Sequence, residues 1–366
     1  MCGIAGFCQF KPGQQLKMKH LEAMTEEIKH RGPDDKGYYQ KGPVGLAMTR
    51  LSIVDVAGGA QPISGEKGKV WVVGNGEIYN HMELRKPLED AGHHFTSNSD
   101  IEVIVHAYEE YGDKFVSKLR GMFAFALWDE TFQKLIRARD HVGVKPLYDT
   151  TADGNLIFGS EIKPILSVDS VPRQVDSKQI LTLMTMQYVP TSDTLFKGIR
   201  KLPAGHTLVC QSGKILIRPF WELPRLSVVS GEDVSAGQEK SLVEELRFRF
   251  FASVKEQLMA DVPVGAFLSG GVDSSLTVAA MTQQTRQSVK TYAVGFANEK
   301  DFNELKHAQK VSRFLKSQHR EIMVNAQMLN DLIPKLVKYQ DDPVIDPAVL
   351  PTLVVSLFAR QEVKVV

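Results

Sequence analysis

The chain has 366 residues, and at ~150 residues per domain this length predicts two or three domains, with two as the working number. Hydrophobic residues make up 43% and charged residues 24%, a balance that excludes an intrinsically disordered chain. Forty-four Lys plus Arg against 43 Asp plus Glu leave a net charge of +1. Because no overall field then favours nucleic acid or an anionic membrane, we expect any phosphate site to be local.

The three cysteines, Cys2, Cys8 and Cys210, have neither CxxC spacing nor a partnering histidine cluster. This argues against a disulfide framework or a zinc site and favours a reducing compartment. The N-terminus lacks the basic leader and long apolar run of a signal peptide, and no later stretch approaches ~20 uninterrupted apolar residues. We therefore expect a cytoplasmic protein with no membrane association.

Short apolar runs broken by Gly, Pro, Asn and Asp dominate residues 1 to about 210 and predict a sheet-rich α+β domain. The expected strands are Cys2–Phe10, Val44–Ile53, Lys69–Val73, Met122–Trp128, Lys134–Ala138 and Leu156–Gly159. The expected helices are His20–Lys29, Met82–Ala91 and Ser99–Tyr111.

A change of composition near Leu223 to Lys240, towards Ser, Gly and charge, indicates a surface linker. We expect a first domain over residues 1–215, a linker over 216–240 and a second domain over 241–366. In the second domain, strands and helices alternate as in a parallel α/β sheet. They are a helix over 241–258, a strand over 264–268, a helix over 275–283, a strand over 290–296 and a helix over 304–315. The last six residues, QEVKVV, predict the start of another buried strand, so we expect this domain to be incomplete.

The second residue, Cys2, is a candidate nucleophile. Removal of Met1 would leave a thiol and a free α-amino group on one residue, and an amine with an ordinary pKa near ~8 can accept the thiol proton near neutral pH. The thiolate could then attack a carboxamide carbon and form a thioester that water hydrolyses. The alternative is that Cys2 is only a small apolar residue at the start of a strand.

Further motifs favour the catalytic interpretation. NGEIYN contains Asn75 and Gly76, whose side-chain amide and backbone N–H could form an oxyanion hole. In RLSIVD, Arg50 suits an α-carboxylate by bidentate pairing, and in SNSD, Asp100 could bind an α-ammonium group. HRGPDD places Arg31 in a Gly/Pro turn, where a contact to the nucleophile and a scaffold role stay equally open.

MCGIAGF, HRGPDD, RLSIVD, NGEIYN, SNSD, GMFAFALWD and ARDHVGVKPLY occur in this order, and together they resemble the class II glutamine amidotransferase domain. The resemblance implies an N-terminal-nucleophile fold, an αββα sandwich. It also implies catalysis by Cys2 with Asn75 and Gly76, and support of the nucleophile loop by Arg31. The glutamine-binding residues that it implies are Arg50, Val54, Asn75, Gly76, Glu77 and Asp100.

SGGVDSS follows the apolar run VGAFL and precedes a helical pattern, which is the strand-loop-helix context of a phosphate site. The candidate ATP-binding residues of this loop are Ser269, Gly270, Gly271, Asp273, Ser274 and Ser275, with Asp273 also a candidate Mg²⁺ ligand. A Ser/Gly linker with an ordinary helix cap is the alternative. The loop lacks the lysine of GxxxxGK[ST], which indicates a different class of ATP chemistry.

SGGVDS resembles the signature of the ATP-pyrophosphatases, and by that resemblance Leu268 and Val294 would also contact the nucleotide, although apolar strand residues are more often core. The acidic stretch DDPVIDP, residues 341–347, has two open interpretations, a solvated loop or a contact to the acceptor or a metal. Glu304 matches a family position, and the alternative is an electrostatic role at a helix start.

Both modules in this order resemble the glutamine-hydrolysing asparagine synthetases. The resemblance implies glutamine, aspartate and ATP as substrates, Mg²⁺, adenylation of the aspartate carboxylate, and a homodimer. In that family a strand like VKVV continues into a Ser-Gly-[Asp/Glu]-Gly-x-Asp-Glu motif. Because these 366 residues end before it, we expect a self-sufficient glutaminase half and an inactive synthetase half.

Two other functions stay open. One is an amidotransferase that acts on another carboxylate, such as a sugar-linked or peptidyl one. The other is an ammonia-only glutaminase or silent regulator whose second domain is a binding scaffold. An intact Cys2 disfavours the silent version, and the complete glutamine motif set disfavours a β-lactam-forming relative.

Overall fold

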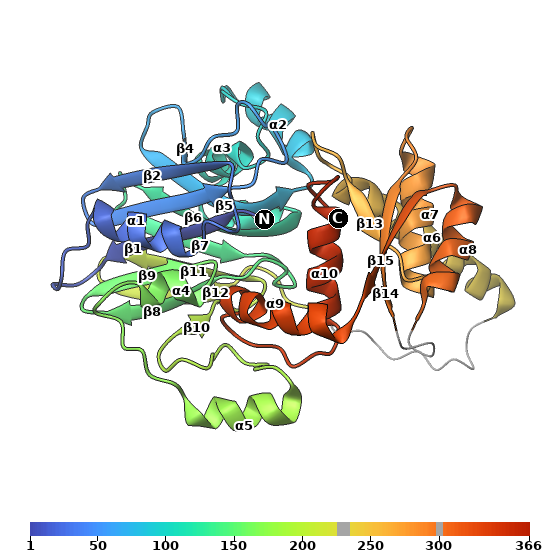
Figure 1. Ribbon diagram of the computed structural model, residues 1–366. Coiled ribbons are helices and arrows are strands. Elements are labelled where there is room, and N and C mark those ends of the chain that lie inside the picture. The colour runs from blue at the N-terminus through green and yellow to red at the C-terminus, as the bar shows by residue number, and fades with distance from the viewer. Residues whose placement is uncertain (225–234, 298–302) are drawn as a thin grey trace. The chain divides into compact units, whose positions relative to one another are not determined.

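The computed structural model describes residues 1–224, 235–297 and 303–366, which form two units (Figure 1). The first unit comprises residues 1–222 and 341–345, and the second comprises 223–340 and 346–366. The linker expected over 216–240 includes residues 225–234, which lie outside the described residues. In the described part of the chain, no helix is both long and apolar enough to span a membrane.

The first unit contains two six-stranded antiparallel sheets. One sheet has the order β10-β8-β9-β1-β3-β2, and the other has the order β12-β11-β7-β6-β5-β4. The first sheet consists of β1 (Gly3–Gln9), β2 (Asp35–Lys41), β3 (Val44–Arg50), β8 (Tyr148–Ala152), β9 (Asn155–Gly159) and β10 (Arg200–Lys201). The second sheet consists of β4 (Ile63–Ser64), β5 (Val70–Ile78), β6 (Gly121–Asp129), β7 (Lys134–Arg139), β11 (His206–Gln211) and β12 (Lys214–Pro219). The helices of this unit are α1 (Met18–Glu27), α2 (His81–Asp90), α3 (Glu102–Tyr111), η1 (Gly112–Lys118), α4 (Ile162–Leu166) and α5 (Ser177–Met186).

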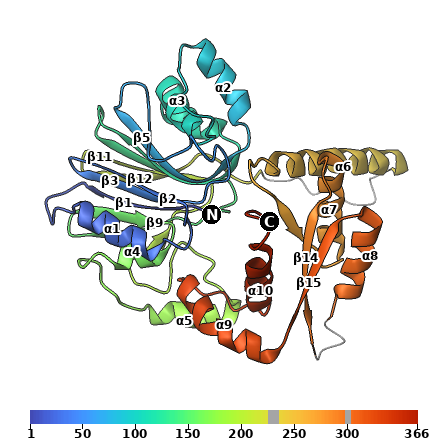
Figure 2. The ribbon, with the colours of Figure 1, turned by 45° about the horizontal axis from the view of Figure 1, so that its top comes forward.

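The two sheets stack face to face with helices outside them, so the unit has four layers, and the expected αββα sandwich is confirmed (Figures 1 and 2). Alternation along the strands produces the layers, since successive side chains point to opposite faces. On β1, Ile4 and Cys8 pack in the core between the sheets, whereas Phe7 packs in the core beneath α1 and α4. On β6, Phe125 packs in the core beneath α2 and α3, and Trp128 packs between the sheets.

The segment Lys201–Val209 belongs to the first unit. β11 pairs with β7 on one side and forms a hairpin with β12 on the other. Alternation explains this placement, because Leu208 and Cys210 are buried against the other sheet while Val209 between them is only half-buried.

The second unit contains a parallel sheet with the order β13-β14-β15. Its strands are β13 (Gly265–Phe267), β14 (Lys290–Phe296) and β15 (Gln318–Val324). Its helices are α6 (Ala236–Gln257), α7 (Val272–Gln284), α8 (Leu305–Leu315), α9 (Ala326–Tyr339) and α10 (Val349–Ala359). α7 and α8 are the crossover helices between successive strands, so the alternating pattern expected for a parallel α/β sheet is confirmed.

Helices cover both faces of this sheet. Leu268 and Ala293 pack with residues of α7 and α8, whereas Tyr292 packs with residues of α10. At the edge, Val365 forms a parallel bridge to Val264, and its carbonyl accepts a hydrogen bond from Gly265 at 2.9 Å. The expected strand in QEVKVV is thus represented by one bridge beside β13.

Candidate active site

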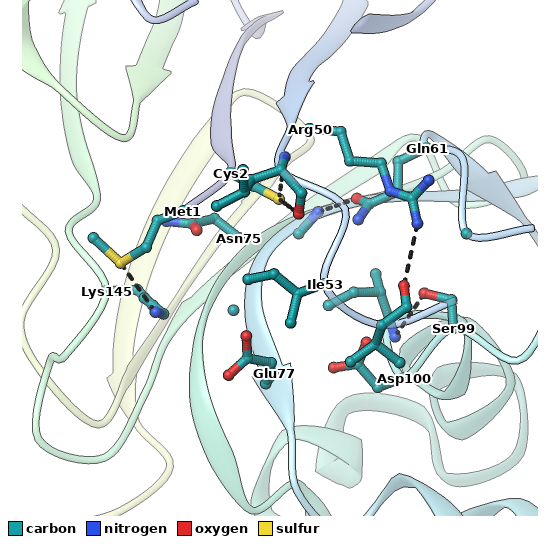
Figure 3. Close-up of a pocket in the computed structure, with 16 residues that line it drawn as sticks. Met1, Cys2, Arg50, Ile53, Gln61, Asn75, Glu77, Ser99, Asp100 and Lys145 are labelled. Carbon is teal, nitrogen blue, oxygen red and sulfur yellow. Dashed lines mark hydrogen bonds between the residues drawn. The ribbon is translucent and has the colours of Figure 1, made fainter. Parts of the chain in front are cut away.

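Cys2 lies at the start of β1 and opens on a pocket of about 460 Å³ in the first unit (Figure 3). The backbone N–H of Leu51 donates to the thiol sulfur at 3.4 Å, and the thiol contacts the carbonyl of the same residue at 3.6 Å. Burial raises the pKa of the Cys2 thiol, and only part of this effect is offset by Leu51 and by the positive charges of the N-terminus and Arg50. The thiol therefore needs a nearby base to become a nucleophile.

Asn75 and Gly76 lie on β5 and line the same pocket. The Asn75 side chain is only 1% exposed, and its Nδ2 has no hydrogen-bond partner among the described residues. Such an amide donor without a partner is rare in a protein interior, and one that lines a pocket is suited to donate a hydrogen bond to a ligand oxygen. Gly76 has a φ of 148°, and a Cβ there would lie 2.0 Å from the carbonyl oxygen of Met122, so close packing against β6 requires the glycine.

Arg50, at the end of β3, is buried and holds the loop that follows it. Its guanidinium donates to the carbonyls of Val54 at 3.2 Å, Asp55 at 2.7 Å and Val56 at 3.2 Å. Asp55 has a φ of 47°, and Asn98 donates its backbone N–H to the Asp55 carboxylate. Arg50 thus fixes the turn that presents Val54 to the pocket.

Two buried carboxylates, Glu77 and Asp100, form the acidic part of the pocket. Burial, together with the neighbouring Glu77, raises the pKa of Asp100 to about 7, although the Ile78 N–H donates to this carboxylate at 2.7 Å. Burial also raises the pKa of Glu77, while Lys145 lowers it. Burial keeps such a carboxylate partly protonated, and a cation that binds beside it stabilises the ionised form.

Arg31 lies behind Cys2. Its Nε donates to the Cys2 carbonyl at 3.0 Å and its Nη1 to Glu161 at 2.7 Å. Burial opposes ionisation of Glu161, but hydrogen bonds from His30, Arg31 and Lys163 lower its pKa to about 2. Arg31 therefore anchors the backbone of Cys2 to a fixed negative charge.

All the glutaminase residues expected from the sequence except Arg31 line this pocket. They are joined there by residues that the motifs did not single out. Gln61 accepts the N–H of Gly74 at 2.7 Å, next to Asn75. Lys145, from ARDHVGVKPLY, is buried, and its ammonium contacts the Met1 sulfur at 3.1 Å. Burial lowers the pKa of the Met1 α-amino group to about 6, with Arg31 and Lys145 adding to the effect and Cys2 opposing it. The sequence signal that could have identified Lys145 is its position in a Lys-Pro pair after a buried strand.

In the second unit, the SGGVDSS loop connects β13 to α7. Gly270 has a φ of 85°, and a Cβ there would lie 2.5 Å from the backbone of His307. The Ser269 and Ser274 hydroxyls are 2.9 Å apart, and the Gly271 N–H donates to Ser269. Asp273 lies exposed in the first turn of α7, while the Ser275 hydroxyl is buried without a hydrogen-bond partner among the described residues.

An open pocket of about 1000 Å³ lies beside this loop. Leu268, Ser269, Val294 and Glu304 all line it, together with Pro347 from the acidic stretch. The other loop residues, from Gly270 to Ser275, are not among its lining residues.

Asp341 and Asp342 of the acidic stretch belong to the first unit. Asp341 accepts the backbone N–H groups of Ile162 at 2.5 Å and Lys163 at 2.9 Å and also pairs with the Lys163 ammonium, so it caps α4. Asp342 pairs with Lys201 at 2.6 Å. Both carboxylates therefore have partners within the first unit, whereas the carboxylates of a solvated loop would contact mainly water.

Comparison with known proteins assigns both units. Residues 1–221 match the model of the glutamine amidotransferase domain family, and residues 245–366 match that of asparagine synthase. Asparagine synthetase (glutamine-hydrolyzing) 1 of Bacillus subtilis is 36% identical over all of this chain and 57% of its own length. The putative asparagine synthetase (glutamine-hydrolyzing) 2 of Methanocaldococcus jannaschii is 32% identical over all of this chain and 73% of its own length. Amidase chyE of Penicillium rubens is 35% identical over 79% of this chain and 44% of its own length.

The chain therefore spans between about half and three quarters of the length of these relatives. Its two units match the two family models in the same order as the motifs predicted. With a glutamine amidotransferase domain followed by an asparagine synthase domain, the chain belongs to the glutamine-hydrolysing asparagine synthetase family.

Proposed function

We propose that the first unit hydrolyses glutamine at Cys2 and that the released ammonia converts an ATP-activated aspartate to asparagine at a site built on the second unit. One observation carries the first half of this proposal. The Cys2 thiol and the unpartnered amide of Asn75 open on one pocket with Arg50 and Asp100, and these groups together complement a zwitterionic amino acid with a carboxamide side chain.

The proposed reaction begins with removal of Met1, whose side chain lines the pocket beside Lys145. The new α-amino group of Cys2 takes the thiol proton, and an amine whose pKa is lowered towards 6, as that of Met1 is, is neutral at pH 7 and able to do so. The thiolate adds to the carboxamide carbon, and the oxyanion is stabilised by Asn75 and Gly76. The proton returns to the leaving nitrogen, ammonia departs, and water hydrolyses the thioester to glutamate.

Two side chains of opposite charge, Arg50 and Asp100, would bind the α-carboxylate and α-ammonium groups of glutamine. Arg50 uses three N–H groups on loop carbonyls and offers the remaining ones to the α-carboxylate. Asp100 would bind the α-ammonium group, with Glu77 beside it and Val54 as part of the wall. The Arg31 contact to the Cys2 carbonyl would keep the nucleophile in place.

The SGGVDSS loop would bind ATP. Its backbone amides at the start of α7 and the hydroxyls of Ser269, Ser274 and Ser275 suit phosphate oxygens, and the unpartnered Ser275 hydroxyl supports this assignment. Leu268 and Val294 would contact the nucleotide in the adjoining pocket. Asp273 would bind Mg²⁺, which neutralises phosphate charge when bound.

The direct test measures glutamate, AMP and pyrophosphate formed by the purified protein with glutamine, ATP, magnesium and aspartate. Glutamate release without ATP is expected from the first unit alone. Aspartate-dependent AMP would support the complete reaction. The proposal fails at its first step if glutamine is not hydrolysed by protein from which Met1 has been removed, as verified by intact mass.

The pH dependence of glutamine binding provides a separate prediction. Because burial raises the pKa of Asp100 to about 7, the carboxylate that binds the ammonium group is lost as the pH falls below 7. KM for glutamine is therefore expected to rise by roughly tenfold per pH unit below 7. Asp100→Asn should show a high KM that no longer depends on pH between 6 and 8. A wild-type KM that is flat across this range would contradict the assignment.

A prediction for the second unit concerns Asp273. Asp273→Ala is expected to weaken magnesium-dependent ATP binding by roughly tenfold or more, since a carboxylate on the metal is lost, while ATP binding without magnesium changes little. Isothermal titration calorimetry with both forms of the nucleotide measures this difference. Asp331→Ala, an exposed substitution on α9, is the control. Equal effects of both substitutions would refute the phosphate-loop assignment.

The second candidate function is transfer of ammonia to an acceptor carboxylate other than aspartate. The similarity to amidase chyE supports this alternative. The discriminating measurement is AMP release with aspartate replaced by other carboxylates. We also propose that the protein works as a homodimer in the cytoplasm, where the Cys2 thiol stays reduced; sedimentation analysis tests the dimer.

A further inference from the structure

A cluster of histidine and glutamate side chains lies in the first unit, apart from the residues that line the Cys2 pocket. Glu66 is in the turn between β4 and β5, His93 follows α2, and His106 and Glu109 lie one turn apart on α3. The side chains of His106 and His93 are 1% and 12% exposed. Three separate segments of the chain thus bring imidazoles and carboxylates to one enclosed point.

The contacts within this cluster are long for hydrogen bonds, and the His93 and His106 Nδ1 atoms make none with good geometry. His93 Nδ1 lies 3.4 Å from Glu66 and 3.9 Å from Glu109, and His106 Nδ1 lies 3.8 Å and 3.7 Å from the same two carboxylates. His93 Nδ1, His106 Nδ1 and Glu109 Oε2 are also buried without a hydrogen-bond partner among the described residues. Buried polar atoms without partners are rare, and here three of them belong to the same cluster.

These separations are slightly longer than those between the ligands of a bound metal ion. Four N and O ligands at 2.0–2.1 Å from a tetrahedral Zn²⁺ lie about 3.3 Å from one another, so a small inward movement of these side chains would complete the coordination. Two imidazoles and two carboxylates suit a divalent transition metal, whereas Mg²⁺ and Ca²⁺ prefer oxygen ligands alone.

The outer nitrogens of both rings face further carboxylates. His106 Nε2 lies 3.6 Å from Glu102, and His93 Nε2 lies 3.6 Å from Glu110. A carboxylate on the far nitrogen of a metal-bound histidine fixes the ring and its tautomer. Glu102 in turn accepts hydrogen bonds from the backbone and hydroxyl groups of Thr96 and Ser97.

We propose that Glu66, His93, His106 and Glu109 form a structural binding site for one divalent transition-metal ion, with Zn²⁺ as the ion that this ligand set favours. The ion would link the β4–β5 turn, the segment after α2 and helix α3. Between His93 and His106 the chain carries Ser99 and Asp100, which line the Cys2 pocket, so the ion would hold this segment in shape. The absence of a cysteine ligand explains why the cysteine spacing gave no indication of it.

A proton competes with the ion for Nδ1 of each histidine. Because zinc binds the neutral imidazole, the affinity should increase with pH.

The test uses the full chain in a Cys2→Ala background, which removes the Cys2 thiol as an alternative zinc ligand. The protein is stripped with a chelator, and Zn²⁺ is titrated against a chromophoric competitor. We expect one zinc per chain, and affinity reduced by roughly 100-fold or more in His93→Gln. His94→Gln is the matched control, because the adjacent His94 is exposed and contributes only its backbone N–H to Glu66.

Thermal unfolding gives a second measurement. Added Zn²⁺ is expected to raise the Tm of the parent and of His94→Gln but not that of His93→Gln. If His93→Gln does not fold, Glu109→Gln replaces it. The proposal is overturned if the parent binds no zinc at micromolar free metal. It is also overturned if His93→Gln and Glu109→Gln bind zinc as the parent does, because the ion would then lie elsewhere on the chain.

Discussion

Cys2→Ala is expected to abolish glutamine hydrolysis, with a loss of roughly 10⁴-fold or more in kcat, because the thioester cannot form without the sulfur. Glutamine binding should change little, since Arg50 and Asp100 remain. Glutamate release in a coupled assay measures the first quantity, and quenching or calorimetric titration with glutamine measures the second. If the synthetase reaction is present, free ammonia should support it in the variant, because only the ammonia source has been removed.

Cys8→Ala provides the control on the same strand. Cys8 is buried between the sheets, and its side chain packs in the core with Cys210. The contact with Cys210 and burial raise the pKa of the Cys8 thiol, so it is unsuited to act as a nucleophile. This variant should lose some stability by cavity formation and retain its kcat. Equal loss of hydrolysis in both variants would contradict a specific role of Cys2.

The outcome also depends on Met1. In the structure, the Met1 sulfur contacts Lys145 and its side chain lines the pocket. Only after its removal does the α-amino group belong to Cys2. Protein that retains Met1 by intact mass should therefore be inactive, and treatment with methionine aminopeptidase should restore hydrolysis.

The residues of this pocket could be predicted because their side chains are specified by short motifs at strand ends. Arg50 ends β3, Asn75 to Glu77 lie in β5, and Asp100 precedes α3. The apolar alternation that fixes each strand also fixes which side chains point into the pocket. The αββα layers were implied by the family resemblance, and the same alternation along β1 and β6 accounts for them.

Other features depend on long-range contacts that no local pattern carries. β2 has exposed and half-buried residues throughout, and β4 and β10 have two residues each, so pairing with a neighbour rather than apolar content defines these strands. Lys145 reaches the pocket through the loop after β7, where its ammonium contacts the Met1 sulfur. The four residues of the proposed metal site span residues 66 to 109 with no recurring spacing, so only the fold brings them together.

Asn75 and Asn80, both in NGEIYN, have opposite environments and allow a paired prediction. The Nδ2 of Asn75 has no partner among the described residues. Asn80 is satisfied at both ends, since its Nδ2 donates to Lys118 at 2.9 Å and its Oδ1 accepts the Arg120 N–H at 2.8 Å. We infer that the first amide is reserved for the substrate and the second for the fold.

Asn75→Ala is therefore expected to lower kcat for glutamine hydrolysis by roughly 10²–10³-fold with little change in KM, because the amide acts only on the oxyanion of the transition state. Stability should be unchanged or slightly increased, since the substitution removes a buried donor without a partner. Asn80→Ala should show the reverse, a loss of about 1–3 kcal/mol in the free energy of unfolding with kcat retained in the folded protein. Steady-state kinetics and urea unfolding of both variants measure the four quantities. If Asn75→Ala destabilises the protein as much as Asn80→Ala and leaves kcat intact, the amide has a structural role, and the oxyanion must be stabilised by backbone groups alone.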